Sequence, residues 1–135
     1  MKHAGKIKTT HSMPHSAPPS ETSLPVSEAQ IVAEIMLSMS RIGALVQRNN
    51  SGLFPTADGR RVRAATPGAA DILCCYQGLF IAIECKSARG RQSNAQKRYQ
   101  AAVERAGGIY ILARNYETVL DIIREIDPNL RQSIS

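Results

Sequence analysis

The 135-residue chain contains no tryptophan, two phenylalanines, four tyrosines and three cysteines. Because proteins that bind single-stranded nucleic acid stack successive bases on aromatic side chains, an aromatic content of 4% argues against that mode of binding. Three cysteines are too few, and odd in number, for a disulfide scaffold, so we expect a reducing cytoplasm. Apolar stretches such as Leu79 to Ile83 are far too short to span a bilayer, and the N-terminus lacks the apolar stretch of a signal peptide.

Histidine is absent after the first 15 residues, whereas the cysteines are Cys74, Cys75 and Cys85. A zinc site of mixed ligands is therefore not expected, and no histidine lies near a cysteine to act as its base. We interpret all three cysteines as buried apolar residues. Residues 1–26 hold four of the seven prolines, which predicts a flexible tail or, alternatively, a basic arm on nucleic acid, and one domain over 27–135.

Apolar periodicity predicts an α/β domain. Capping-box spacing occurs at Ser27 and Gln30 and again at Ser93 and Gln96, which marks two helix starts. The pattern predicts helices over 27–42, 93–106 and 117–126 and strands over 44–47, 72–76, 79–85 and 109–112, with residues 60–63 as a candidate polar edge strand. The order α-β-β-β-α-β-α predicts a mixed central sheet flanked by helices.

A charged cluster is expected at the open end of the hairpin formed by 72–76 and 79–85. A two-residue turn at Gln77-Gly78 places Asp71 opposite Glu84, and Lys86 on the same face. Two neighbouring carboxylates repel unless a proton or a cation lies between them, and hard divalent cations such as Mg²⁺ take oxygen ligands. The register therefore predicts a metal site with a lysine beside it. The alternative is a surface salt bridge of Lys86.

Further polar groups have both a functional and a structural interpretation. Glu28 falls on the same helix face as Val32, which predicts a third acidic ligand or, alternatively, a carboxylate stabilised by the helix dipole. Gln96 caps its helix through Ser93, or it reaches a metal-bound water or a phosphate. Asn50-Ser51-Gly52 forms a tight turn, or it offers donors to a phosphate.

The charge is unevenly distributed along the chain. Lys and Arg number 17 against 11 Asp and Glu, a net charge of +6, and the sequence pI is about 9.6. Residues 41–98 hold ten basic and three acidic residues, whereas 99–135 are slightly acidic. The basic excess flanks the predicted metal site and comprises Arg60, Arg61, Arg63, Arg89, Arg91, Lys97 and Arg98. Either this is a solvated basic surface, or it neutralises a phosphodiester backbone that the metal site cleaves.

In these residues the chain resembles the PD-(D/E)xK nuclease superfamily and, within it, a stand-alone VRR-NUC (virus-type replication-repair nuclease) domain. The matching segments are Ser27-Glu28, Arg48-Asn49-Asn50-Ser51-Gly52, Gly68-Ala69-Ala70-Asp71, Glu84-Cys85-Lys86, Gly90, Ser93 to Gln96, and Gly107-Gly108. The resemblance implies a restriction-endonuclease-like αβββαβ core. The chain departs from the family at Ala70, where proline is often found, and at Cys85, the middle of the E-x-K motif.

The resemblance also implies residue roles. Asp71 and Glu84 would bind Mg²⁺ or Mn²⁺, with the carbonyl of Cys85 as a further ligand. Lys86 would position or activate the attacking water. Glu28 would support the metal, and Gln96 would orient Lys86 or the water. DNA contacts are expected from Arg48, Asn50, Ser51, Arg61, Arg63 and Lys97.

The function implied by the resemblance is that of a metal-dependent, structure-specific DNA endonuclease. Small stand-alone members of this family are typically bacterial or phage proteins. They resemble homodimeric structure-specific endonucleases and act on branched DNA such as four-way (Holliday) junctions. Symmetric cutting of a junction needs two sites and hence a dimer. The alternatives are a flap- or end-processing nuclease, a non-catalytic nucleic-acid-binding module of the same fold, and a small interaction protein whose charged residues form a surface salt bridge.

Overall fold

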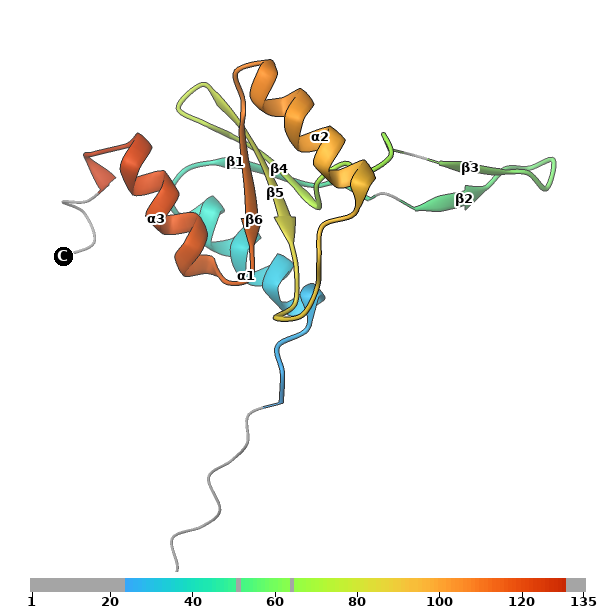
Figure 1. Cartoon of the computed structure of the whole chain (residues 1–135), viewed down its shortest axis with the longest axis horizontal. Coiled ribbons are helices and arrows are strands. Elements are labelled where there is room, and N and C mark those ends of the chain that lie inside the picture. The colour runs from blue at the N-terminus through green and yellow to red at the C-terminus, as the bar shows by residue number, and fades with distance from the viewer. Residues whose placement is uncertain (1–23, 51, 64, 131–135) are drawn as a thin grey trace, which may run out of the picture.

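Nine helices and strands occupy the part of the chain that the computed structural model describes, residues 24–50, 52–63 and 65–130 (Figure 1). In chain order they are α1 (Glu28–Arg41), β1 (Leu45–Arg48), β2 (Leu53–Pro55), β3 (Arg61–Arg63), β4 (Ile72–Tyr76), β5 (Leu79–Cys85), α2 (Asn94–Arg105), β6 (Ile109–Ala113) and α3 (Tyr116–Ile126). Of the predicted tail, residues 1–23 lie outside the described residues. Residues 24–26 are exposed and belong to no helix or strand.

A mixed four-stranded sheet forms the centre of the fold, in the order β1-β4-β5-β6. The pairs β1–β4 and β4–β5 are antiparallel, and β5–β6 is parallel. Helices α1 and α3 cover one face, and α2 lies on the other (Figure 1). This arrangement confirms the predicted α/β class with a mixed sheet and flanking helices. Strand β2 was not predicted; with β3 it forms a separate two-stranded hairpin inserted between β1 and β4.

The two faces of β5 enter different parts of the core. Ile81, Ile83 and Cys85 pack in the large cluster with α1 and α3, whereas Ala82 packs in the smaller cluster with Val103 of α2. Because side chains alternate along a strand, Glu84 follows Ala82 and lies between the sheet and α2. The carboxylate of Glu84 is therefore buried between the sheet and α2.

The hairpin of β4 and β5 has the predicted register. Gln77 and Gly78 both adopt positive φ angles, 49° and 78°, as a type I′ turn requires. The last observed pair in the ladder is Ile72 with Ile83, so the next position brings Asp71 to Glu84. The two-residue turn at one end of the hairpin therefore fixes the carboxylate pair at the other.

Both predicted capping boxes are present, at Ser27 with Gln30 and at Ser93 with Gln96. Two expectations about burial are wrong. Glu28 is exposed, although Val32 on the same stripe is buried, because Glu28 is the first residue of α1 and its carboxylate bonds the backbone of Ser87 at the surface. Cys75 is exposed on the alternate face of β4, whereas the other two cysteines are buried as expected. No helix in the described residues is long and apolar enough to cross a membrane.

Candidate active site

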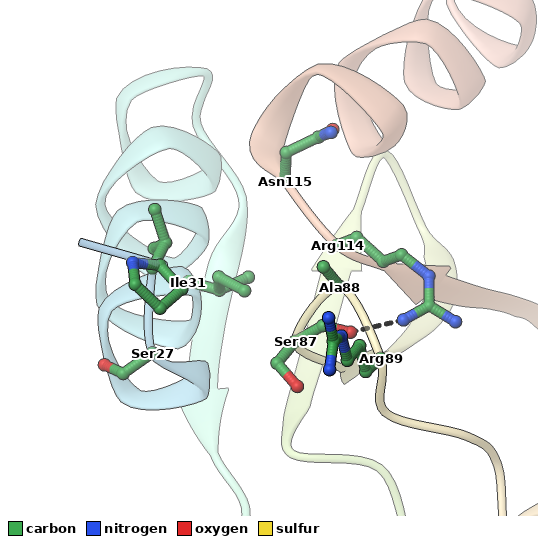
Figure 2. A pocket seen from close by; sticks show the side chains of 9 residues that line it. Ser27, Ile31, Ser87, Ala88, Arg89, Arg114 and Asn115 are labelled. Atoms are coloured by element: carbon green, nitrogen blue, oxygen red, sulfur yellow. Dashed lines mark hydrogen bonds between the residues drawn. The ribbon is translucent and has the colours of Figure 1, made fainter. Parts of the chain in front are cut away.

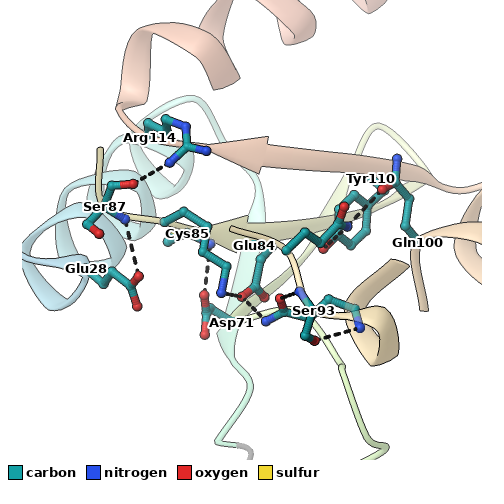
Figure 3. A network of polar contacts seen from close by, with 12 residues as sticks. Glu28, Asp71, Glu84, Cys85, Ser87, Ser93, Gln100, Tyr110 and Arg114 are labelled. Carbon is teal, nitrogen blue, oxygen red and sulfur yellow. Dashed lines mark hydrogen bonds and ion pairs between the residues drawn. The ribbon is translucent and has the colours of Figure 1, made fainter. Parts of the chain in front are cut away.

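Asp71 and Glu84 form a carboxylate pair at the open end of the β4–β5 hairpin (Figure 3). Glu84 is only 3% exposed, and Asp71 Oδ2 accepts a hydrogen bond from the backbone N–H of Cys85 at 2.9 Å. Burial raises the pKa of Glu84 to about 7; the Asp71 carboxylate adds to this rise, and Lys86 opposes it. A buried carboxylate thus lies beside the partly exposed carboxylate of Asp71, and in the absence of a cation the charged form of Glu84 is disfavoured.

The two oxygens of Glu84 differ in their contacts. Oε1 accepts a hydrogen bond from Gln96 Nε2 at 2.6 Å and lies 3.3 Å from Lys86 Nζ. Oε2 is buried and accepts no hydrogen bond from any described residue. A buried carboxylate oxygen without a partner is costly, and beside a second carboxylate it marks a place that a cation would satisfy.

Gln96 both caps its helix and contacts the carboxylate pair. Its side-chain oxygen accepts from Ser93 N at 2.8 Å and caps α2, while its amide nitrogen donates to Glu84. The cap therefore positions the amide group that orients the carboxylate.

Glu28 reaches the same region from the opposite side. Its Oε1 accepts from the N–H of Ser87 at 3.3 Å, and the carbonyl of Ser87 accepts from Arg114 Nη1 (Figure 3). A Cβ at Gly90 would lie 3.2 Å from Glu28 Oε1 and 3.2 Å from Lys86 Cδ. Glu28 is thus close to the stem of Lys86, although it is exposed rather than buried.

Two residues to which the sequence analysis gave no role hold Asp71 in place. Asn49 donates from its backbone N–H to Asp71 O at 2.8 Å and from Nδ2 to Ala70 O at 3.1 Å. Gly68 adopts φ +75°, and a Cβ there would lie 2.3 Å from the carbonyl of Ala95 in α2. Both residues lie within the segments that match the family, and this position is the feature of the sequence that could have indicated their role. An Asn or a Gly elsewhere has many structural roles.

An open cleft borders Asp71. It is lined by Arg48, Asn49, Asn50, Gly52, Phe54 and Asp71. Two of the expected DNA contacts, Arg48 and Asn50, therefore come together beside Asp71. Arg61, Arg63 and Lys97 are exposed but line no part of this cleft, and Ser51 lies outside the described residues.

A second pocket lies between α1, the loop after β5 and the start of α3 (Figure 2). Ile31, Ala88, Arg89 and Asn115 are among its lining residues. Arg89 belongs to the basic residues that flank the predicted metal site, but none of the candidate metal ligands or DNA contacts lines this pocket. Of the candidate site residues, Asp71, Arg48 and Asn50 therefore line the first cleft.

The residues available to a metal ion are few. In the described ranges, no three His, Cys, Asp or Glu side chains lie close enough together to hold an ion. The carboxylate donors would be Asp71 and Glu84, and the carbonyl of Cys85 would be a main-chain donor. This all-oxygen set, with the unpartnered Oε2, fits a hard cation that keeps several waters. The Cys85 side chain packs in the large apolar cluster, on the face of β5 opposite to Glu84, so its sulfur does not face the carboxylates.

Comparisons with known proteins bear on the fold. No family model and no curated protein sequence matches the chain. Among solved structures, one described as a "VRR_NUC domain" matches with a TM-score of 0.53 and 18% identity over 72% of this chain and 94% of that one. The chain therefore has the fold of a VRR_NUC domain, which confirms the fold implied by the sequence resemblance.

Proposed function

We propose that this protein is a metal-dependent nuclease that hydrolyses phosphodiester bonds in DNA. The observation that supports this most directly is the arrangement around Glu84. One of its oxygens is held by Gln96 and Lys86, while the other is buried, unpartnered within the described residues, and close to a second carboxylate. A surface salt bridge, the alternative considered from the sequence, would be solvated, whereas the side chain of Lys86 is only 13% exposed.

Each residue has a role in this proposal. Asp71, Glu84 and the Cys85 carbonyl would hold Mg²⁺ or Mn²⁺, which when bound polarises the phosphate and lowers the pKa of water. Lys86 places its ammonium group beside the carboxylates, where it can orient the attacking water and stabilise developing negative charge. Gln96 keeps Glu84 in one orientation. Glu28 lies near the stem of Lys86 and would act through it.

The cleft suits a phosphate backbone. Arg48 and Asn50 line it and supply a positive charge and an amide next to Asp71. Exposed Arg61, Arg63 and Lys97 would neutralise more distant phosphates. For the particular substrate we propose branched DNA such as a four-way junction, cut by a homodimer, because each chain supplies one site. A flap- or end-processing nuclease is the alternative within the same chemistry.

Cleavage of a mobile four-way junction and of linear duplex, with Mg²⁺ or Mn²⁺ and with chelator, tests the proposal. Wild type should cut only with metal, and Asp71→Ala and Lys86→Ala should not cut. Asp121→Ala, at an exposed acid on α3, is the matched control and should cut like wild type. Metal should also raise the melting temperature of wild type but not of Asp71→Ala. Salt-sensitive DNA binding without cleavage would instead identify a binding module.

The positions of the cuts distinguish the two substrates. Paired, symmetric cuts across a junction, from a protein that sediments as a dimer, would support a resolvase. Single cuts next to a flap or an end would support the processing nuclease.

A further inference from the structure

Phe54 occupies an unusual position for an aromatic residue. It is one of only two phenylalanines in the chain, and it is 48% exposed. Its side chain lines the same cleft as Asp71 and Arg48. A single exposed aromatic side chain is common, so the informative feature is the position of this one in the cleft beside Asp71, where it can contact a ligand.

Strands β2 and β3 carry Phe54 on a hairpin that extends away from the sheet (Figure 1). The register pairs Phe54 with Val62, so these two side chains share one face. Arg61 and Arg63 alternate with Val62 and lie on the other face, together with their partners Pro55 and Leu53. The hairpin therefore carries its two arginines on one face and Phe54, which lines the cleft, on the other.

Gly52 lies beside the ring of Phe54. A Cβ at this glycine would lie 3.2 Å from Phe54 Cε2 and 3.3 Å from Cζ. The absence of a side chain at position 52 therefore leaves room for the ring in the cleft, where half of Phe54 stays exposed to a ligand.

A planar partner for this ring must have an uncovered face. In a paired duplex, each base is covered by its neighbours above and below, whereas a base at a branch, a fork or a frayed end is not. One ring in the cleft suits one such base, in contrast to the series of rings used by single-strand-binding proteins.

We infer that Phe54 stacks on an unpaired base next to the phosphodiester bond at Asp71 and makes the enzyme selective for DNA with splayed strands. This inference rests on the proposed nuclease function and adds a substrate class to it. Arg48, in the same cleft, would hold the adjoining phosphate. A second copy of the chain packing on Phe54 and Val62 is the competing occupant of this face.

Fluorescence anisotropy with two labelled DNAs tests the inference. One is a splayed-arm duplex, and the other is a fully paired duplex of the same length. Ca²⁺ replaces Mg²⁺ because it takes the same oxygen ligands, and a gel checks that the DNA stays intact. The variants are Phe54→Ala, Phe54→Trp and Phe80→Ala. Phe80 is the matched control, since it is 46% exposed and lines neither described pocket.

Wild type should bind the splayed DNA more tightly than the paired DNA. Phe54→Ala should bind splayed DNA about 5- to 150-fold more weakly, the range found for removing one base–aromatic stack, and should bind paired DNA as wild type does. Phe54→Trp should keep the preference, and Phe80→Ala should leave it unchanged.

Three results would overturn the inference. If Phe54→Ala keeps the wild-type preference, the ring is not the stacking group, while the proposed nuclease function still stands. If Phe54→Ala turns a dimer into a monomer by sedimentation and weakens both DNAs equally, the face belongs to a second copy. If neither the wild type nor any variant binds either DNA, both the inference and the proposed function fail.

Discussion

Gln96 donates its side-chain N–H to Glu84 Oε1 at 2.6 Å, and its side-chain oxygen caps the helix that carries it. One amide group therefore joins the start of α2 to the buried carboxylate of β5. Substitution by glutamate separates the two roles, because a glutamate still accepts the capping hydrogen bond but cannot donate to Glu84.

Gln96→Glu should therefore keep the cap of α2 and lose activity, while repulsion between the new carboxylate and Glu84 lowers the free energy of unfolding. Loss of a hydrogen bond to a charged group is worth about 1.5–3 kcal/mol, which corresponds to at least a tenfold fall in single-turnover rate. Gln30→Glu is the matched control, since Gln30 makes the same cap in α1. Equal activity of the two variants would show that Gln96 acts only as a cap.

Gly68 should be intolerant of any side chain. A Cβ at this position would lie 2.3 Å from the backbone of Ala95, which cannot move without displacing α2, and φ is +75°. Overpacking and left-handed strain together predict that Gly68→Ala lowers the free energy of unfolding by about 2–4 kcal/mol. Gly107→Ala has a similar φ, +89°, with open space around it, and should cost only about 1–2 kcal/mol. Urea denaturation of both variants measures the difference, and equal losses would contradict the packing argument.

Acid should weaken the fold through Asp127. Its carboxylate accepts from Tyr76 Oη at 2.7 Å and from Gln77 Nε2 at 2.8 Å, and the bond from Tyr76 is the main cause that lowers its pKa. A lowered folded-state pKa gives stability that is present above the unfolded value, about 3.9, and is lost as the pH falls toward the lowered one.

Tyr76→Phe removes the main donor, so its free energy of unfolding should fall less steeply than that of wild type between about pH 5 and pH 2. Chemical denaturation across this range provides the slopes. Parallel curves for the two proteins would mean that this buried bond does not control the acid response.

The basic face of the β2–β3 hairpin should determine part of the salt dependence of DNA binding. If Arg61 and Arg63 each neutralise one phosphate, the double alanine variant should lower the slope of log K against log salt by about 2. Arg105→Ala, at an exposed position late in α2, should leave the slope unchanged. Anisotropy titrations at several salt concentrations give the slopes. Unaltered slopes in the double variant would show that this face does not contact DNA.

Local chemistry explains which parts of the fold could be predicted. The two capping boxes and the Gln77-Gly78 turn involve residues only a few positions apart, and the turn transmits its register along the hairpin to Asp71 and Glu84. Strand β2 escaped prediction because three residues ending in Pro55 carry almost no periodic signal, and the strand exists only through pairing with β3.

The burial of a side chain was harder to predict than the side of its helix or strand on which it lies. Helical spacing correctly aligns Glu28 with Val32 around the axis of α1, but it does not indicate where the neighbouring sheet ends. Alternation likewise places Cys75 opposite to Cys74 without showing that the outer face of β4 is uncovered there. The double contact of Gln96 could not be foreseen, because it depends on how α2 sits on the sheet.

Ser87 makes a backbone hydrogen bond on each side: its N–H donates to Glu28 of α1, and its carbonyl accepts from Arg114, which follows β6. Lys86, the residue before it, is anchored by its own N–H to Ala113. Three backbone hydrogen bonds, one at Lys86 and two at Ser87, therefore fix the main chain that carries the ammonium group. We therefore expect that a substitution at Arg114, which does not contact the carboxylates directly, changes the position of Lys86 through the backbone of Ser87.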